Sequence, residues 1–195
     1  MKKIILASGS PRRRELLTQI GISFEVVKAE GEEKITTDDP EEAVKELAMQ
    51  KAQEVAGRVD ADVVIGADTV VAVDGEIMGK PKDPEDVVRM IHRIQGRDHE
   101  VLTGVAVILK KGEVETTINF AETTRVHVFP MTEEEIQSYV ASKEPMDKAG
   151  AYGIQGLFAA YVSGIEGDYN NVVGLPVGRL YQEVKAIADV DLRTL

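Results

Sequence analysis

The segment KIILASGSPRRRELL, residues 3 to 17, constrains the fold more than any other stretch of the chain. Its apolar run at residues 4 to 6 is followed by a turn of small residues, which is typical of a buried strand that enters a glycine-containing loop. Ser10 is a good helix N-cap, and Pro11 suits the first helical position because its missing N–H would have no partner there. The segment therefore predicts a strand, a loop and a helix in direct succession.

Three arginines in the first turn of this predicted helix are unusual. The free N–H groups and the helix dipole already make that end positive, so acidic residues are preferred there. Phosphate oxygens accept hydrogen bonds from loop N–H groups, from the hydroxyls of Ser8 and Ser10, and from guanidinium groups such as those of Arg12, Arg13 and Arg14. The segment favours a site for a phosphorylated ligand, and the alternative is three arginines that extend into solvent.

The overall charge limits what this ligand can be. The chain has 195 residues and a net charge of −11 at pH 7, so it offers no general basic field for nucleic acid. The first fourteen residues nevertheless carry five basic residues and no acid. A positive island on a negative molecule fits a small phosphorylated ligand better than a duplex.

Length and composition suit a single domain over residues 1–195. The chain has no cysteine, which excludes disulfides and thiolate metal sites, and its three histidines lack the spacing of a metal site. The opening apolar run is too short for a signal peptide, and no run approaches the roughly 20 apolar residues of a membrane span. We therefore expect a cytoplasmic protein that does not contact membranes.

The remaining patterns predict an α/β fold with a mixed central sheet and flanking helices. Helix signals begin near Pro40, Pro84, Thr132 and Pro176. Strand signals cover residues 24–27, 63–65, 70–73, 101–120 and 123–129, with tight turns at residues 74–75 and 111–112. The glycine-dense segment 147–176 predicts loops and a hairpin.

Two polar side chains stand in otherwise apolar patterns. Asp68 interrupts a run that reads as buried strand, and a buried carboxylate is costly unless it is paired, hydrogen-bonded or bound to metal. Its role is either structural or one of metal binding or proton transfer. Lys51 lies on the apolar stripe of the second predicted helix, where a lysine either passes the core edge to solvent or extends into a cleft.

Several loop residues are further candidates. The acidic loop with Glu30, Glu32 and Glu33 is either a solvated surface or a seat for a divalent metal. Lys80 follows a glycine and precedes a proline, a short pattern that suits a phosphate contact but has little specificity. Gln155 carries an amide that can read the edge of a nucleobase, although a hydrogen bond within its loop is the more common role.

Together these residues resemble a known family, the Maf family of nucleoside triphosphate pyrophosphatases. The resemblance runs in order across nearly the whole chain, and a set of spaced motifs is far more specific than any single one. The motifs are SGSPRR at 8–13, Glu33, Lys51, GADTVV at 66–71, GKPKD at 79–83 and DKAGAYGIQG at 147–156. Arg12, Thr69 and Gln155 resemble the branch that acts on dTTP and UTP rather than on 7-methyl-GTP.

The resemblance implies two lobes around a cleft, a fold shared with inosine triphosphate pyrophosphatases, and often a homodimer. It also implies hydrolysis of a nucleoside triphosphate between the α and β phosphates, with a divalent cation, Mg²⁺ or Mn²⁺, as cofactor. Asp68 would accept the proton of the attacking water and would act with Glu33 through the metal.

The remaining site residues take their roles from the same resemblance. Contacts to the triphosphate would come from Ser8, Arg12, Arg13, Lys51 and Lys80. Thr69 and Gln155 would recognise the pyrimidine base. Two other functions stay open at this point, namely a regulatory or nucleotide-binding module linked to septum formation, and a broader house-cleaning pyrophosphatase for modified nucleotides.

Overall fold

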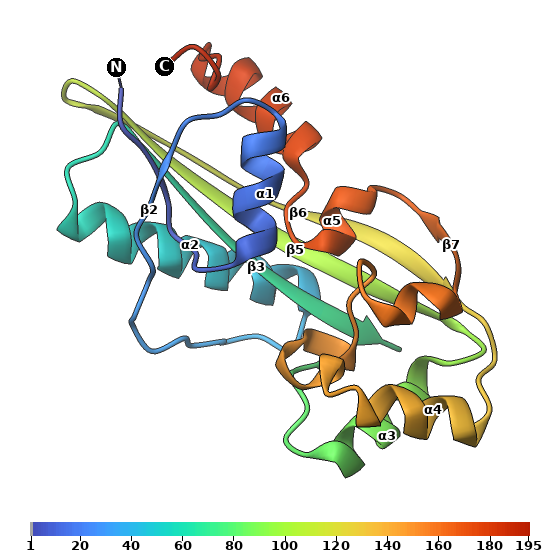
Figure 1. Ribbon diagram of the computed structural model, residues 1–195. Helices are drawn as coiled ribbons and strands as arrows, with labels where there is room; N and C mark the ends of the chain where they lie inside the picture. Colours follow the sequence, from blue (N-terminus) through green and yellow to red (C-terminus); the bar gives the residue numbers. More distant parts are fainter. Residues whose placement is uncertain (1) are drawn as a thin grey trace.

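A mixed sheet of seven strands organises the computed structural model, which describes residues 2–195 (Figure 1). The strand order is β2-β1-β3-β5-β6-β7, and β4 also pairs with β3. Only the pairs of β1 with β2 and with β3 are parallel. The strands are β1 (Ile4–Leu6), β2 (Glu25–Val26), β3 (Val63–Val73), β4 (Glu76–Met78), β5 (Asp98–Lys111), β6 (Val114–Val128) and β7 (Val162–Glu166). The predicted α/β class with a mixed sheet is confirmed.

The helices begin largely where the cap residues predict. Asp39, Asp83 and Thr132 each accept a backbone N–H of the first helical turn, and Thr132 completes a capping box with Glu135. Ser10 occupies the N-cap position of the first helix, as predicted, although its side chain makes no capping hydrogen bond. The helices are α1 (Pro11–Gln19), α2 (Pro40–Arg58), α3 (Pro84–Ile94), α4 (Glu133–Ala141), α5 (Tyr169–Val173) and α6 (Val177–Ala188). Within residues 2–195, no helix has the length and apolar composition needed to span a membrane.

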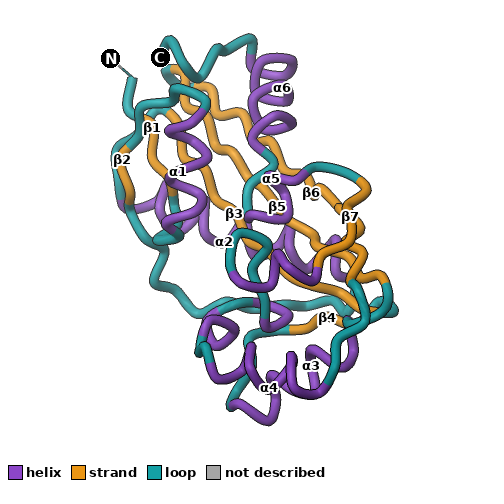
Figure 2. Tube along the Cα trace, turned by 45° about the vertical axis from the view of Figure 1, so that its right-hand side comes forward, coloured by secondary structure: helices purple, strands orange, loops and turns teal. Residues whose placement is uncertain are grey.

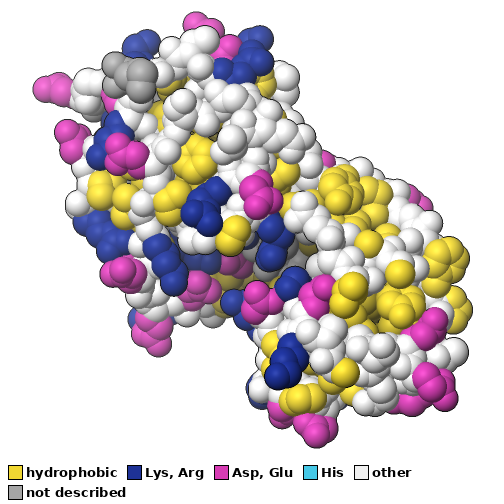
Figure 3. Space-filling model, in the orientation of Figure 1, with side chains coloured by type: hydrophobic (Ala, Val, Ile, Leu, Met, Phe, Trp, Pro, Cys, Tyr) yellow, Lys and Arg dark blue, Asp and Glu magenta, His cyan; other side chains and the backbone are white. Residues whose placement is uncertain are grey.

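The two faces of the sheet are covered differently. Helix α2 packs on one face, and the other face is covered by α1 and α6 at one end and by α3 and α4 at the opposite end (Figure 2). Figure 3 shows a hollow between these two parts of the molecule, with basic and acidic side chains along its rim. The expected arrangement of two lobes around a cleft is therefore present.

Strand β3 runs through both parts and is longer than its apolar runs suggest. The sequence indicates apolar segments at 63–65 and 70–73, whereas the structure has one strand paired with β5 from Val63 to Ala72. Its other edge pairs with β1 only as far as Ile65 and with β4 only from Val71 onward. Between these two residues, neither of those strands covers that edge of β3, and Asp68 and Thr69 lie at the centre of this open edge.

Two glycines bring α2 unusually close to the sheet. A Cβ atom at Gly66 of β3 would lie 2.3 Å from the carbonyl oxygen of Ala48, and one at Gly104 of β5 would lie 2.0 Å from that of Val44. Real side chains do not tolerate such distances, so only glycine permits this approach. The close packing places Lys51, one turn beyond Ala48, next to β3.

The segment 147–176 differs from its prediction. It contains no hairpin of its own: its one strand, β7, pairs instead with the end of β6, from Arg125 to Val128. The preceding residues form short 3-10 turns, η1 (Glu144–Asp147), η2 (Ala149–Ala151) and η3 (Leu157–Tyr161).

Candidate active site

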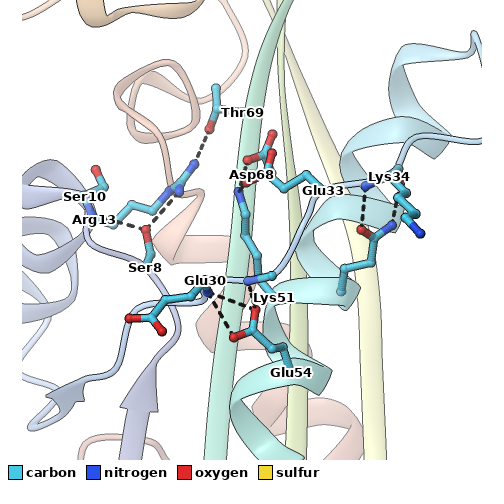
Figure 4. A network of polar contacts seen from close by, with 12 residues as sticks. Ser8, Ser10, Arg13, Glu30, Glu33, Lys34, Lys51, Glu54, Asp68 and Thr69 are labelled. Carbon is cyan, nitrogen blue, oxygen red and sulfur yellow. Dashed lines mark hydrogen bonds and ion pairs between the residues drawn. The ribbon is translucent and has the colours of Figure 1, made fainter.

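The candidate site is built around two neighbouring residues at the open edge of β3. Side chains of successive strand residues point to opposite faces, so Asp68 and Thr69 serve two different groups of side chains (Figure 4). We call these the carboxylate–lysine cluster, comprising Glu33, Lys51 and Asp68, and the hydroxyl–guanidinium cluster, comprising Ser8, Arg13, Thr69 and Thr103.

In the carboxylate–lysine cluster, one ammonium group contacts two carboxylates. Lys51 Nζ lies 3.0 Å from Glu33 Oε1 and also donates to Asp68 Oδ1. The side chains of Lys51 and Asp68 are 16% exposed and that of Glu33 is 54% exposed. Of the two roles open to Lys51, the structure shows the side chain extending into the site rather than out to solvent.

The loop that carries Glu33 is held along α2 by a ladder of side chains four residues apart. Glu54 accepts the N–H groups of Glu30 and Gly31 at 2.8–3.0 Å, and Gln50 accepts that of Lys34 at 3.0 Å. The bonds from Glu30 and Gly31 lower the pKa of the Glu54 carboxyl. These anchors lie on both sides of Glu33 and fix its position.

The ladder continues toward the start of α2, where Glu46 accepts both the N–H and the hydroxyl of Thr36. Of the other acids in this loop, Glu30 pairs with Arg58 at 3.3 Å. Glu33 is therefore the acid of the loop that the structure brings to Lys51.

The hydroxyl–guanidinium cluster centres on Arg13, which is only 9% exposed. Its Nη1 donates to Ser8 Oγ at 3.1 Å and its Nη2 to Thr69 Oγ1 at 2.9 Å, while Nε donates to the carbonyl oxygen of Gly174 at 2.8 Å. Burial lowers the pKa of the guanidinium, and the negative charges of Asp68 and Glu33 act in the opposite direction. Arg13 therefore joins the loop after β1, strand β3 and the chain before α6 from inside the protein.

The other two arginines of the first turn point elsewhere. Arg14 is exposed and Arg12 is half-buried. In the segment after α4, the hydrogen bond from Lys148 lowers the pKa of Asp147, and the charge of Arg12 acts in the same direction. The structure thus divides the three arginines, with Arg13 taken inside and Arg12 at the rim.

Two predicted site residues lie in loops beside the far end of β3. The N–H of Gly150 donates to the carbonyl oxygen of Gly79 at 3.0 Å, and a Cβ at Gly150 would lie 2.7 Å from the side chain of Val71. The loops that carry Lys80 and Gln155 are therefore packed together three residues beyond Asp68. Both side chains are exposed, and within residues 2–195 neither makes a hydrogen bond or ion pair with the two clusters.

Sequence reasoning missed Thr103. Its hydroxyl lies 2.9 Å from that of Thr69, and its side chain is fully buried. The available signal was a threonine inside the apolar run VLTGVAVIL, which has the same character as the interruption at Asp68. The role of its neighbour Gly104 in seating α2 was missed as well.

The residues present fit the divalent cation that the family resemblance implies. Glu33 and Asp68 contact the same ammonium group, so their oxygens converge on one point. The described residues contain no group of three or more histidine or acidic side chains arranged as a metal site. A pair of carboxylates suits Mg²⁺, which keeps several waters and takes further oxygens from substrate phosphates.

Comparison with known proteins places this chain in one family. The family model described as "Maf-like protein" matches residues 3–187. A dTTP/UTP pyrophosphatase of Agathobacter rectalis is 52% identical, covering 96% of this chain and 98% of its own length, and one of Lachnoclostridium phytofermentans is 51% identical, covering 95% of each. The chain therefore belongs to the Maf family. Among solved structures, the Staphylococcus aureus Ham1 protein matches with a TM-score of 0.48 and 16% identity, covering 65% of this chain and 72% of that one.

Proposed function

We propose that this chain is a nucleoside triphosphate pyrophosphatase that converts dTTP and UTP to the monophosphate and pyrophosphate. The observation that carries the proposal is the meeting of the two clusters at the open edge of β3, which places Lys51, Asp68 and Glu33 beside Arg13 and Ser8. The relatives that are about half identical over nearly their whole length bear the name dTTP/UTP pyrophosphatase.

The triphosphate would lie along the open edge, between the loop after β1 and the loop after β4. Phosphoryl chemistry depends mainly on positioning and on neutralising charge, so cations on both sides of the phosphates are what the reaction needs. Arg12 at the rim and the exposed Lys80 are free to turn toward bound phosphates. Arg13 retains further N–H donors besides those it uses internally, and Ser8 lies beside it.

In the reaction, the oxygen of a water molecule bonds to the α phosphorus. The bond from this phosphorus to the α–β bridging oxygen breaks, and pyrophosphate leaves. Asp68 accepts the proton of the attacking water. Lys51 donates to the Asp68 carboxylate, holds it in place and balances its charge. This contact supports the proposal that Asp68 lies beside the reacting phosphate.

Glu33 and Asp68 would hold the divalent cation, Mg²⁺ or Mn²⁺. When bound, it neutralises charge on the phosphate oxygens. The support is that the two carboxylates lie close together beside the Lys51 ammonium, and that oxygen ligands suit these cations.

Thr69 and Gln155 would face the pyrimidine base. We also infer, from the family resemblance, that the protein is cytoplasmic and forms a homodimer. Sedimentation analysis of the purified protein tests the homodimer directly.

The experiment is pyrophosphate release from dTTP, UTP, CTP, ATP, GTP and 7-methyl-GTP, with Mg²⁺ or Mn²⁺ and with chelator, using Asp68→Asn as the control. We expect metal-dependent release that favours dTTP and UTP and that the variant loses. Equal release from purine and modified nucleotides would instead support a broader house-cleaning enzyme. No release from any nucleotide by folded protein would refute the activity and favour the regulatory function.

A further inference from the structure

We propose that Thr103 is a positioning residue that fixes the direction of the Thr69 hydroxyl, so that Thr69 can only accept a hydrogen bond from the ligand. This inference rests on the proposed function, in which Thr69 faces the pyrimidine base. It assigns a role to a residue that does not itself touch the substrate.

The contacts form a continuous series of hydrogen bonds. Arg13 Nη2 lies 2.9 Å from Thr69 Oγ1, Thr69 Oγ1 lies 2.9 Å from Thr103 Oγ1, and Thr103 Oγ1 lies 3.1 Å from the carbonyl oxygen of Asn171. Thr103 and Asn171 are both fully buried, so water does not substitute for these partners.

The groups at the two ends of this hydrogen-bond series, Arg13 and the carbonyl of Asn171, determine the direction in which the bonds run. A guanidinium can only donate, and a carbonyl oxygen can only accept, whereas each hydroxyl has a single proton. Thr103 must therefore give its proton to Asn171, since a buried carbonyl without a partner is costly. The proton between the two hydroxyls then belongs to Thr69, and the bonds run from Arg13 to Thr69 to Thr103 to Asn171.

Another acceptor near the Thr69 hydroxyl already receives a hydrogen bond from a different donor. The carbonyl oxygen of Gly174 lies 3.4 Å from Thr69 Oγ1, but it receives the Nε–H of Arg13 at 2.8 Å. Thr69 thus has no need to turn its proton toward Gly174. One lone pair of the Thr69 oxygen remains, and its side chain is only partly buried, so a ligand can reach that lone pair.

A Thr69 hydroxyl whose proton is already given to Thr103 favours a ligand that donates a hydrogen bond to it. Uracil and thymine carry an N3–H donor on their pairing edge, whereas N3 of cytosine is an acceptor. The amide of Gln155 has both a donor and an acceptor and can turn to suit either base, so it does not make this distinction alone. Thr103, by committing the proton of Thr69 inward, gives the site its preference for dTTP and UTP over CTP.

The test compares Thr103→Val, which removes the hydroxyl at nearly constant shape, with Thr103→Ser, which keeps it. The readout is the ratio of kcat/KM for UTP to that for CTP, with urea unfolding of each variant as a measure of stability. We expect Thr103→Val to lower this ratio by roughly three- to tenfold, because the Thr69 proton becomes free to serve an acceptor. Thr103→Ser should keep the ratio near that of the wild type.

The outcomes separate this inference from the function on which it rests. If Thr103→Val loses stability and slows both nucleotides equally, Thr103 is structural and the inference is wrong, while the activity stands. A wild-type protein that hydrolyses neither UTP nor dTTP overturns the proposed function itself. If Thr103→Val fails to fold, Thr103→Ala replaces it as the variant without a hydrogen-bonding side chain, and an unchanged ratio in folded Thr103→Ala contradicts the inference.

Discussion

The two clusters that meet at β3 are built in opposite ways. The carboxylate–lysine cluster consists of charged groups and opens to solvent through Glu33, which is more than half exposed and is fixed mainly through the loop on α2. The hydroxyl–guanidinium cluster is buried except at Thr69, and its hydrogen bonds join parts of the chain up to 161 residues apart. Charges near water can exchange partners at modest cost, whereas a buried hydrogen-bonded group cannot. The difference suggests that the first cluster performs the chemistry and the second holds a fixed shape for recognition.

The largest effect on turnover is expected for Lys51→Met. This change leaves Glu33 and Asp68 facing each other without their shared cation, and we expect kcat for UTP to fall by about 10²–10³. The matched control is Lys45→Met on the same helix, since the ammonium of Lys45 pairs with Glu41 and Glu42 on the surface of α2. Equal turnover in the two variants would show that Lys51 takes no part in the chemistry.

Arg13→Lys tests the buried cluster. Lysine has no planar fork and cannot serve Ser8, Thr69 and Gly174 together, so we expect roughly 2 kcal/mol less stability in urea unfolding. The exposed Arg14→Lys is the control and should unfold like the wild type. A stable Arg13→Lys protein would contradict the view that this cluster depends on fixed geometry.

Glu54→Ala should disturb only the carboxylate–lysine cluster. It removes the acceptor for the N–H groups of Glu30 and Gly31 and so loosens the loop that carries Glu33. We expect kcat/KM to fall by about fivefold for UTP and CTP alike, the size of one or two lost hydrogen bonds. Gln53→Ala, on the exposed side of α2, is the control. A changed ratio between the two nucleotides would mean that the clusters are not independent.

Replacement of His99, which lies outside both clusters, should have the smallest effect on activity. His99 is buried against Tyr152, and burial lowers its pKa to about 4. The unfolded chain binds this proton near pH 6.5 and the folded protein does not, so stability should fall as the pH drops from 6.5 toward 4. His99→Leu should lose that part of the pH dependence in urea unfolding and keep its kcat at pH 7. An unchanged slope would show that His99 titrates normally in the folded protein.

Local signals were enough to predict most elements and part of the site. Prolines and cap residues such as Asp39 and Thr132 determine helix starts through contacts within one turn, and a sequence shows those directly. Of the seven residues that the structure gathers into the two clusters, all but Thr103 came from positions where a polar side chain breaks a local pattern or from the family resemblance.

Long-range contacts could not be predicted in the same way. Thr103 contacts Thr69 and Asn171 only when β5 pairs with β3 and α5 packs against β5. Gly104 has a role only because α2 lies against it. Strand β7 finds its partner in β6, far from its own neighbours in sequence, which is why a hairpin was wrongly expected there. The local composition of a segment does not reveal which distant surface it completes.

The most direct test of the division between the clusters is steady-state kinetics of two neighbouring variants, Asp68→Asn and Thr69→Val, on UTP and CTP. We predict that Asp68→Asn lowers kcat by about 10²–10⁴ for both nucleotides and leaves their ratio of kcat/KM unchanged. Thr69→Val should keep most of the kcat for UTP and lower the preference for UTP over CTP. If both variants change turnover and preference to the same extent, the two faces of β3 do not have separate tasks.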